Sequence, residues 1–378
     1  MIKPLLFIFL LVSSFNISSS SMQDMDQSMH NKMHHKSMHS AKMHGPIGLM
    51  GDHFHKKGES MVSIRYMKMS MNQNYLGSSK ISDLDIIQLP NPSGMPKNLS
   101  VVPQEMEMDM VMLGSMYAPS DSITLMGMAM FNLKEMDLKT YQPMMNRNVL
   151  GQFSTRSSGL STINISALFK IYDSNGSKLH AQLGIQKDMG KSDLQGQALT
   201  PMGTYNSIFL PYGMQIGDKS NSALSAITYT KTFGLWKIGG QLKSKLNIES
   251  DLWNFGDSYE ANLWTQRDIN NKSAWSLRLK FQDIQPVDGF NQNINAPVQT
   301  ANPLNYGGQT IDLGIGINIM LSKGSIGLEA YRPISTDLNG PQMGMNWGMQ
   351  AGYHLSLSLI HISEPTRLLS IAYAGFWM

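Results

Sequence analysis

The feature that most constrains this chain is a period-two alternation of apolar and polar residues, which recurs in short segments from about Ser60 onward. In the segment QTIDLGIGINIML one face is made by Ile311, Leu313, Ile315, Ile317, Ile319 and Leu321, and the other by Asp312, Gly314, Gly316 and Asn318. Successive side chains of a β-strand point to opposite faces, so the pattern is typical of strands with one apolar and one polar face. About twelve such segments are separated by turn residues, and most have the roughly 9 to 11 residues that a tilted strand needs to cross a bilayer. We therefore predict an all-β fold, a transmembrane antiparallel β-barrel of about 12 strands.

A soluble periplasmic β-sandwich or barrel is the alternative fold, because its strands alternate in the same way. Aromatic residues near the strand ends favour the membrane barrel, since an interfacial girdle lies there. These residues are Tyr66, Tyr117, Trp236, Trp264, Trp275, Tyr331 and Trp347. A closed barrel would also leave no unpaired strand edge in lipid.

The N-terminus has the pattern of an export signal. MIKPLLFIFLLVSSFNISSSS contains one cation, a short apolar run and then small polar residues, which predicts a signal peptide at residues 1–21. No later run approaches the roughly 20 apolar residues of a spanning helix. The chain has no cysteine, a net charge of +3 and only 15% charged residues, which argues against disulfides, thiolate metal sites and a nucleic-acid partner. We expect a protein exported to the bacterial outer membrane.

Residues 22–44 are predicted to form a flexible, disordered segment rich in methionine and histidine. Thioether and imidazole groups suit Cu(I), and imidazole also binds Cu(II), Zn and Ni. The candidate metal ligands are Met29, His30, Met33, His34, His35, Met38, His39, Met43 and His44. A polar leader without any ligand is the alternative. Neither interpretation requires a cofactor, and copper is the ion that these ligands suit best.

A second candidate metal site lies directly before the first predicted strand. Asp52, His53 and His55 follow one another closely in MGDHFHKKGE. The equal alternative is a turn in which these side chains satisfy backbone groups.

The parity of the strands assigns a set of side chains to the barrel lumen, because Lys or Arg at mid-membrane on the lipid face would cost about 2 to 4 kcal/mol. The set comprises His180, Gln182, Lys237, Lys243, Glu260, Arg278, Lys280, Asp312, Glu329, Gln350, His354, Met126, Met128 and Met130. The methionines are interpreted as adaptable packing against a solute or a folded-in loop, with a soft-metal path as the alternative. In 105–117 the same cost predicts that Glu105, Glu107 and Asp109 face inward, which turns the alternating methionines of 106–112 outward.

Several stretches carry a resemblance to one family. They are GPIGLMGDHFHKKGESMVSIRYMKMSM (45–71), MYAPSDSITLMGMAMF (116–131), FSTRSSGLSTINISALF (153–169), LPYGMQIGD (210–218) and LNGPQMGMNWGMQAGYH (338–354). They resemble bacterial outer-membrane transporter-like barrels filed with the meta-cleavage (MetA) pathway of phenol degradation. The resemblance spans nearly all of 45–356, where the barrel is expected, and it implies a passive channel for small organic molecules.

The C-terminal stretch departs from the strand pattern. LSLIHISEPTR (357–367) resembles the translation of a sequencing adapter, and Pro365 could not donate to a strand ladder. We therefore expect residues 357–378 to be a non-native, artefactual tail.

The leading hypothesis is an outer-membrane channel or transporter for passive passage of small, hydrophobic or aromatic, organic solutes. Its partners would be outer-membrane lipid, the barrel-assembly machinery and the solute. The alternative is a copper-binding or copper-export-associated outer-membrane protein that uses the Met/His segment, and a soluble periplasmic metal-binding protein is a third. An enzyme is not expected, because no nucleophile motif, phosphate loop, dinucleotide fingerprint or zinc-protease motif is found.

Overall fold

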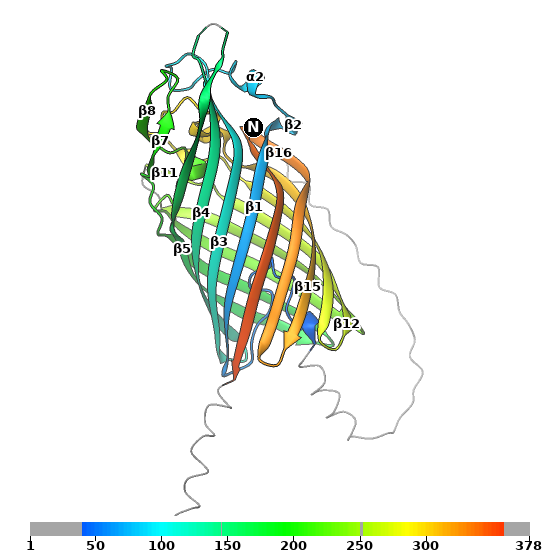
Figure 1. Ribbon diagram of the computed structural model, residues 1–378. Helices are drawn as coiled ribbons and strands as arrows, with labels where there is room; N and C mark the ends of the chain where they lie inside the picture. Colours follow the sequence, from blue (N-terminus) through cyan, green and yellow to red (C-terminus); the bar gives the residue numbers. More distant parts are fainter. Residues whose placement is uncertain (1–39, 145, 250–251, 359–378) are drawn as a thin grey trace, which may run out of the picture. The chain divides into compact units, whose positions relative to one another are not determined.

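The computed structural model describes residues 40–144, 146–249 and 252–358, and these form a closed β-barrel (Figure 1). The ring consists of β1 (Glu59–Gly77), β3 (Val101–Ser120), β4 (Ile123–Tyr141), β5 (Val149–Ser174), β6 (Ser177–Asp188), β9 (Asn221–Phe233), β10 (Trp236–Glu249), β12 (Ser258–Asn270), β13 (Ser273–Ile284), β15 (Gly308–Leu321) and β16 (Gly324–Ser358). The strands follow one another around the ring in sequence order, and β16 pairs with β1 to close it. The prediction of an all-β antiparallel barrel is confirmed.

The barrel closes through an unusual last strand. The sheet has 12 labelled strands, of which β2 (Ser79–Lys80) lies outside the ring, so eleven remain within it. The part of β16 up to Leu338 pairs with β15, and the part from Leu338 onward pairs with β1, both antiparallel. An antiparallel ring can close only with an even number of crossings. The chain therefore reverses direction within β16, which supplies two of about twelve crossings.

One end of the barrel has short turns and the other has long loops. Turns of a few residues join β3 to β4, β5 to β6, β9 to β10, β12 to β13 and β15 to β16. The long connections carry α2 (Asp83–Ile86), β7 (Gln195–Leu199), β8 (Tyr205–Phe209), η3 (Tyr212–Met214), β11 (Trp253–Asn254), β14 (Asp288–Gly289), η4 (Gln299–Ala301) and η5 (Pro303–Asn305). In outer-membrane barrels the short turns face the periplasm and the long loops face outward. We name the two ends inner and outer accordingly.

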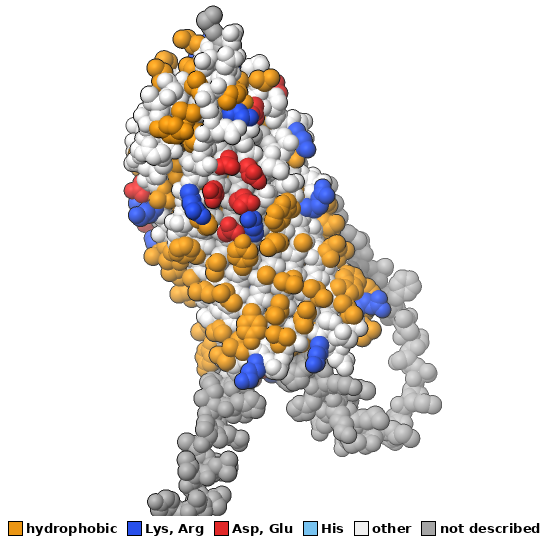
Figure 2. Space-filling model, in the orientation of Figure 1, with side chains coloured by type: hydrophobic (Ala, Val, Ile, Leu, Met, Phe, Trp, Pro, Cys, Tyr) orange, Lys and Arg blue, Asp and Glu red, His pale blue; other side chains and the backbone are white. Residues whose placement is uncertain are grey.

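Large apolar side chains are exposed on the outside of strands all around the ring, and they form an apolar belt on the face that Figure 2 shows. Side chains such as Leu263 and Ile315 are 62% and 64% exposed although they lie in the middle of their strands. Exposure of so many large apolar groups is explained by contact with lipid. Among the described residues, no helix is long and apolar enough to cross a membrane.

Two residues predicted for an interfacial girdle point into the lumen instead. Trp264 and Tyr331 are 4% and 5% exposed. A glycine leaves room for each ring. A Cβ at Gly239 of the neighbouring β10 would lie 2.2 Å from Trp264, and one at Gly348, in the second half of β16, would lie 2.3 Å from Tyr331. The girdle prediction was wrong for these two residues, because it considered their position along the strand and not the face of the strand on which they lie.

The direction predicted for the acidic residues of β3 was also wrong. Glu107 and Asp109 face outward, where Glu107 pairs with Lys68 at 2.9 Å and Asp109 accepts a hydrogen bond from Tyr66. β3 has 20 residues, more than a bilayer crossing requires. Charged side chains gather between the apolar belt and the loops (Figure 2), where they avoid the cost assumed for mid-membrane charges.

Candidate functional site

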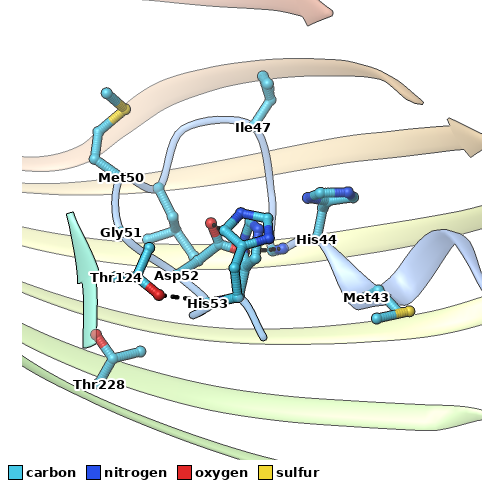
Figure 3. A network of polar contacts seen from close by, with 12 residues as sticks. Met43, His44, Ile47, Met50, Gly51, Asp52, His53, Thr124 and Thr228 are labelled. Carbon is cyan, nitrogen blue, oxygen red and sulfur yellow. Dashed lines mark hydrogen bonds and ion pairs between the residues drawn. The ribbon is translucent and has the colours of Figure 1, made fainter. Parts of the chain in front are cut away.

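The lumen is occupied at its inner end by residues 40–58, which we call the plug. The plug begins with η2 (Ala41–Met43) and continues through GPIGLMGDHFHKKG into β1. Ala41, Ile47 and Leu49 are at most 2% exposed. The plug has no strands of its own, and it is buried because the barrel wall surrounds it. Figure 3 shows the loop from Met43 to His53 lying against the barrel strands, with the strands in front cut away.

Polar side chains of the wall hold the plug by its backbone. Arg65 of β1 donates to the carbonyl oxygens of Ile47 and Leu49 at 2.7 and 2.6 Å. The other wall-to-carbonyl hydrogen bonds join His180 to Gly51, Lys237 to Met43, Gln241 to Met50, Gln266 to His44, and Asn318 to Ala41, His44 and Gly45. A buried carbonyl without a partner would cost about 1 to 3 kcal/mol. These inward side chains therefore supply hydrogen-bond donors to the buried backbone carbonyl groups of the plug.

Glycines of the plug allow its close approach to the wall. A Cβ at Gly48 would lie 2.4 Å from a terminal nitrogen of Arg278 and 2.7 Å from Glu329. Gly51 has a φ of +63°, a left-handed conformation that favours glycine. The spacing GPIGLMG in the sequence thus places small residues where the plug touches buried polar groups.

A charged wall lines the lumen on β12, β13, β15 and β16. Arg278 forms a buried ion pair with Glu329, its Nε lying 3.2 Å from both carboxylate oxygens, and donates to Asn262 at 2.9 Å. Lys280 pairs with Asp312 at 2.8 Å. These charges are compensated within the wall, as buried charges must be.

Four histidine rings gather where the plug meets the barrel. The ring centroids of His44 and His53 are 4.7 Å apart, those of His53 and His55 4.9 Å, and those of His44 and His354 5.0 Å. Asp52 pairs with His53 at 3.0 Å, and Figure 3 shows both close to His44. The Nε2 atoms of His53, His55 and His354 and the Nδ1 atom of His44 are buried without a hydrogen-bond partner.

Burial controls the charge of this cluster. It lowers the pKa of His44 well below its ordinary value, and His53 and His354 lower it further. Burial also lowers the pKa of His55 to about 3. For Asp52 burial alone would raise the pKa, but the attraction and hydrogen bond of His53 outweigh it and hold the pKa well below the usual range. His44 and His55 are therefore neutral at pH 7, and Asp52 is ionised.

A methionine wall covers the inner face of β1, β3 and β4. It is made of Met61, Met67, Met69, Met71, Met106, Met108, Met110, Met112, Met116, Met126, Met128, Met130 and Met136. The register aligns these residues across the three strands, with Met116 opposite both Met61 and Met126. The outward direction predicted for the methionines of 106–112 was wrong, because the acidic residues between them lie outside the apolar belt.

The outer mouth is filled by an apolar cluster of loop residues. Tyr212 and Trp253 are 0% and 3% exposed, with ring centroids 4.9 Å apart. Phe255 and Tyr306 pack against them, together with Met106 and Met136 of the wall. The lumen is thus covered by aromatic loops at one end and by the plug at the other.

The structure places the predicted lumen residues on the inner face of the barrel. His180 and Lys237 contact the plug, whereas Lys243 and Glu260 lie 3.9 Å apart further up the lumen. The other predicted residues that are buried there are Gln182, Arg278, Asp312, Glu329, His354, Met126 and Met128, with Lys280 and Met130 half-buried.

The predicted metal ligands divide into two groups. Those of 29–39 lie outside the described residues, and so does most of the segment 22–44. Within the part of the chain that the structure describes, no three His, Asp or Glu side chains are arranged to hold one metal ion. The hypothesis of a site at Asp52, His53 and His55 therefore gains no support from its geometry as it stands.

Sequence reasoning did not single out four residues that hold the plug. They are Arg65, Gln241, Gln266 and Asn318. The alternation gives the face on which such a side chain lies, but not its hydrogen-bond partner. The single available signal was the glycine-rich stretch GPIGLMGDH, which has no strand or helix period and lies shortly before a strand.

Together, the closed ring, the apolar belt and the polar lumen define the fold of an outer-membrane β-barrel. Comparison with known protein families gave no match, and no curated protein matches the chain. Among solved structures it is similar to an outer membrane channel from Pseudomonas putida F1, with 15% identity and a TM-score of 0.52, over 82% of this chain and 100% of that one. A Pseudomonas aeruginosa FadL homologue has 9% identity and a TM-score of 0.38, over 79% of this chain and 90% of that one. The P. putida toluene transporter TodX has 10% identity and a TM-score of 0.38, over 80% of this chain and 91% of that one. The first likeness supports the fold, and the other two are too distant to carry an argument.

Proposed function

We propose that the chain is an outer-membrane channel that admits small organic solutes when its plug is displaced. The observation that carries this proposal is the way the plug is held. Separate side chains of the wall donate hydrogen bonds to its carbonyl oxygens, as Arg65 does to those of Ile47 and Leu49. Such contacts can be exchanged for water, so the plug can leave without unfolding the barrel. Ring closure depends on backbone pairing between strands and not on the plug.

The lining of the pathway favours apolar or aromatic solutes. A solute arriving from outside meets the aromatic cluster around Tyr212 and Trp253, and then the methionine wall. Aromatic groups and adaptable thioethers accommodate apolar solutes of varied shape. The charged wall on the facing strands would exclude ions that cannot replace the Arg278–Glu329 pair. The similar structure from P. putida F1 is itself described as an outer membrane channel, which supports the channel part of the proposal.

Export to the outer membrane, contact with its lipid and insertion by the barrel-assembly machinery belong to the same proposal. A non-enzymatic role does too. The alternative of a copper-export-associated protein rests on the Met/His segment, most of which lies outside the described residues.

The test is permeation through the purified protein in liposomes. Uptake of a small neutral aromatic probe should exceed that of a sugar of similar size, and should be absent from liposomes without protein. Equal uptake of both probes would remove the solute preference. A barrel sealed to every solute, even when the plug is weakened by Arg65→Met, would overturn the channel.

A further inference from the structure

The strands β1, β3 and β4 sort their apolar residues by chemical type. Apart from Leu138 near the loops, the inward apolar side chains of their central parts are methionines. The large apolar groups exposed on the same strands are Val62, Ile64, Tyr66, Leu76, Val111, Leu113, Tyr117, Leu125 and Phe131, and none of them is a methionine. Packing against a plug or a solute needs only apolar volume, which leucine or isoleucine would supply. The sorting therefore points to a role for the thioether sulfur.

A small cavity lies where the inner end of the methionine wall meets the plug. Its volume is about 20 Å³, while one water needs about 10 to 15 Å³. It is lined by Met50, Gly51, Asp52, Met61, Ser63, Arg65, Gly114, Ser115, Met116, Met126 and Met128. The cavity can therefore hold one water or one ion, among buried thioethers.

The charges around the cavity balance. Asp52 contributes one negative charge, and Arg65 one positive charge. The Arg65 guanidinium is already engaged by the plug, and its NH1 also lies 2.8 Å from the sulfur of Met50. Among the hydrogen bonds of the described residues, no donor reaches the sulfurs of the four wall methionines that line the cavity, Met61, Met116, Met126 and Met128. Neutral, soft ligands in a cavity without net charge suit a monovalent soft ion better than a divalent hard one.

We propose that this cavity binds one Cu(I) ion through the thioethers of Met61, Met116, Met126 and Met128. All four are buried, at 3 to 7% exposed, and they belong to one cluster with Met50 beside it. The site agrees with the absence of a group of His, Asp or Glu ligands among the described residues. It is separate from the Met/His segment, and it does not depend on solute passage.

The experiment first removes the candidate ligands of residues 22–39. In the full chain, every methionine and histidine of residues 22–39 is replaced, and this protein is titrated with Cu(I) in detergent against a colorimetric Cu(I) chelator under reducing conditions. The test variant adds Met61→Leu, Met116→Leu, Met126→Leu and Met128→Leu. Leucine keeps the volume and removes the sulfur. The matched control adds Met71→Leu, Met106→Leu, Met136→Leu and Met343→Leu, all in the apolar cluster of the outer mouth.

We expect the protein without the ligands of residues 22–39 to bind one equivalent of Cu(I). The affinity of the test variant for Cu(I) should be at least 100-fold lower, and that of the control should stay within threefold. X-ray absorption of the bound copper should show sulfur neighbours. Unchanged affinity in the test variant, or copper surrounded only by nitrogen and oxygen, would overturn the site. Heat-modifiable migration in gels reports whether each variant folds. If the fourfold variant does not fold, Met126→Leu with Met128→Leu replaces it, with at least a tenfold loss expected and an unchanged affinity again counting against the site.

Discussion

The guanidinium of Arg65 donates a 2.6 Å hydrogen bond to the carbonyl oxygen of Leu49, and so joins the first barrel strand to the plug inside the lumen. Both residues are buried, at 6% and 1% exposed. The contact is local in sequence, since 16 residues separate the two, but it spans the boundary between a rigid strand and a segment without strand structure. It is the clearest case of a wall side chain that holds the plug in place.

Replacing Arg65 should loosen the plug. Arg65→Met keeps much of the side-chain length and removes the donors to Ile47 and Leu49. Hydrogen bonds to charged groups contribute about 1.5 to 3 kcal/mol each, so we expect the open fraction to rise by roughly tenfold or more. Single-channel recording in planar bilayers measures this fraction. The control is Arg156→Met, at an exposed arginine that lies 3.7 Å from Glu135, and it should leave the open fraction unchanged. An equal open fraction in both variants would show that Arg65 does not hold the plug.

Arg278 and Glu329 should stabilise the barrel mainly because each compensates the buried charge of the other. Arg278→Leu or Glu329→Leu alone leaves a buried charge without its partner, which costs about 3 to 5 kcal/mol, whereas the double variant should cost much less. Denaturant unfolding in detergent, followed by heat-modifiable migration, gives the free energy of unfolding for each protein. Additive losses in the double variant would contradict the pairing of these two side chains.

The apolar belt should not tolerate a cation at its centre. Ile315, in the middle of β15, is 64% exposed on the outer face. Ile315→Arg should make folding into lipid less favourable by about 2 to 4 kcal/mol, because the charge must leave water. Met202→Arg, on an exposed loop residue outside the barrel strands, serves as the control and should fold normally. If folding yields into liposomes are equal, the belt does not face lipid at Ile315.

The alternation of residues was sufficient to predict the barrel and the face of most inward side chains, because period two fixes direction once one face is apolar. It failed for the methionines of β3, since the cost of a charge in lipid depends on depth as well as on face. Trp264 shows the same limit: its place in the lumen is permitted by Gly239 on the adjacent strand, and alternation along one strand carries no such information.

The plug could not be predicted for a different physical reason. Its residues have neither strand nor helix period, and their burial is created by a wall assembled from distant parts of the chain. Asn318, for example, donates to the carbonyl oxygen of Gly45, which is 273 residues away. The outer mouth is similar, because Tyr212 and Trp253 meet through separate loops.

The central claim, that the plug closes the channel, is tested most directly by fixing the plug with a disulfide. A Cβ at Gly327 would lie 2.8 Å from the Cβ of Ile47, and disulfide-bonded Cβ atoms are about 3.5 to 4.5 Å apart, so a shift of about 1 Å suffices. The chain has no cysteine, so Ile47→Cys with Gly327→Cys can form one bridge only. Single-channel recording should show a closed barrel under oxidising conditions and openings after reduction. The same conductance in both states would contradict closure by the plug.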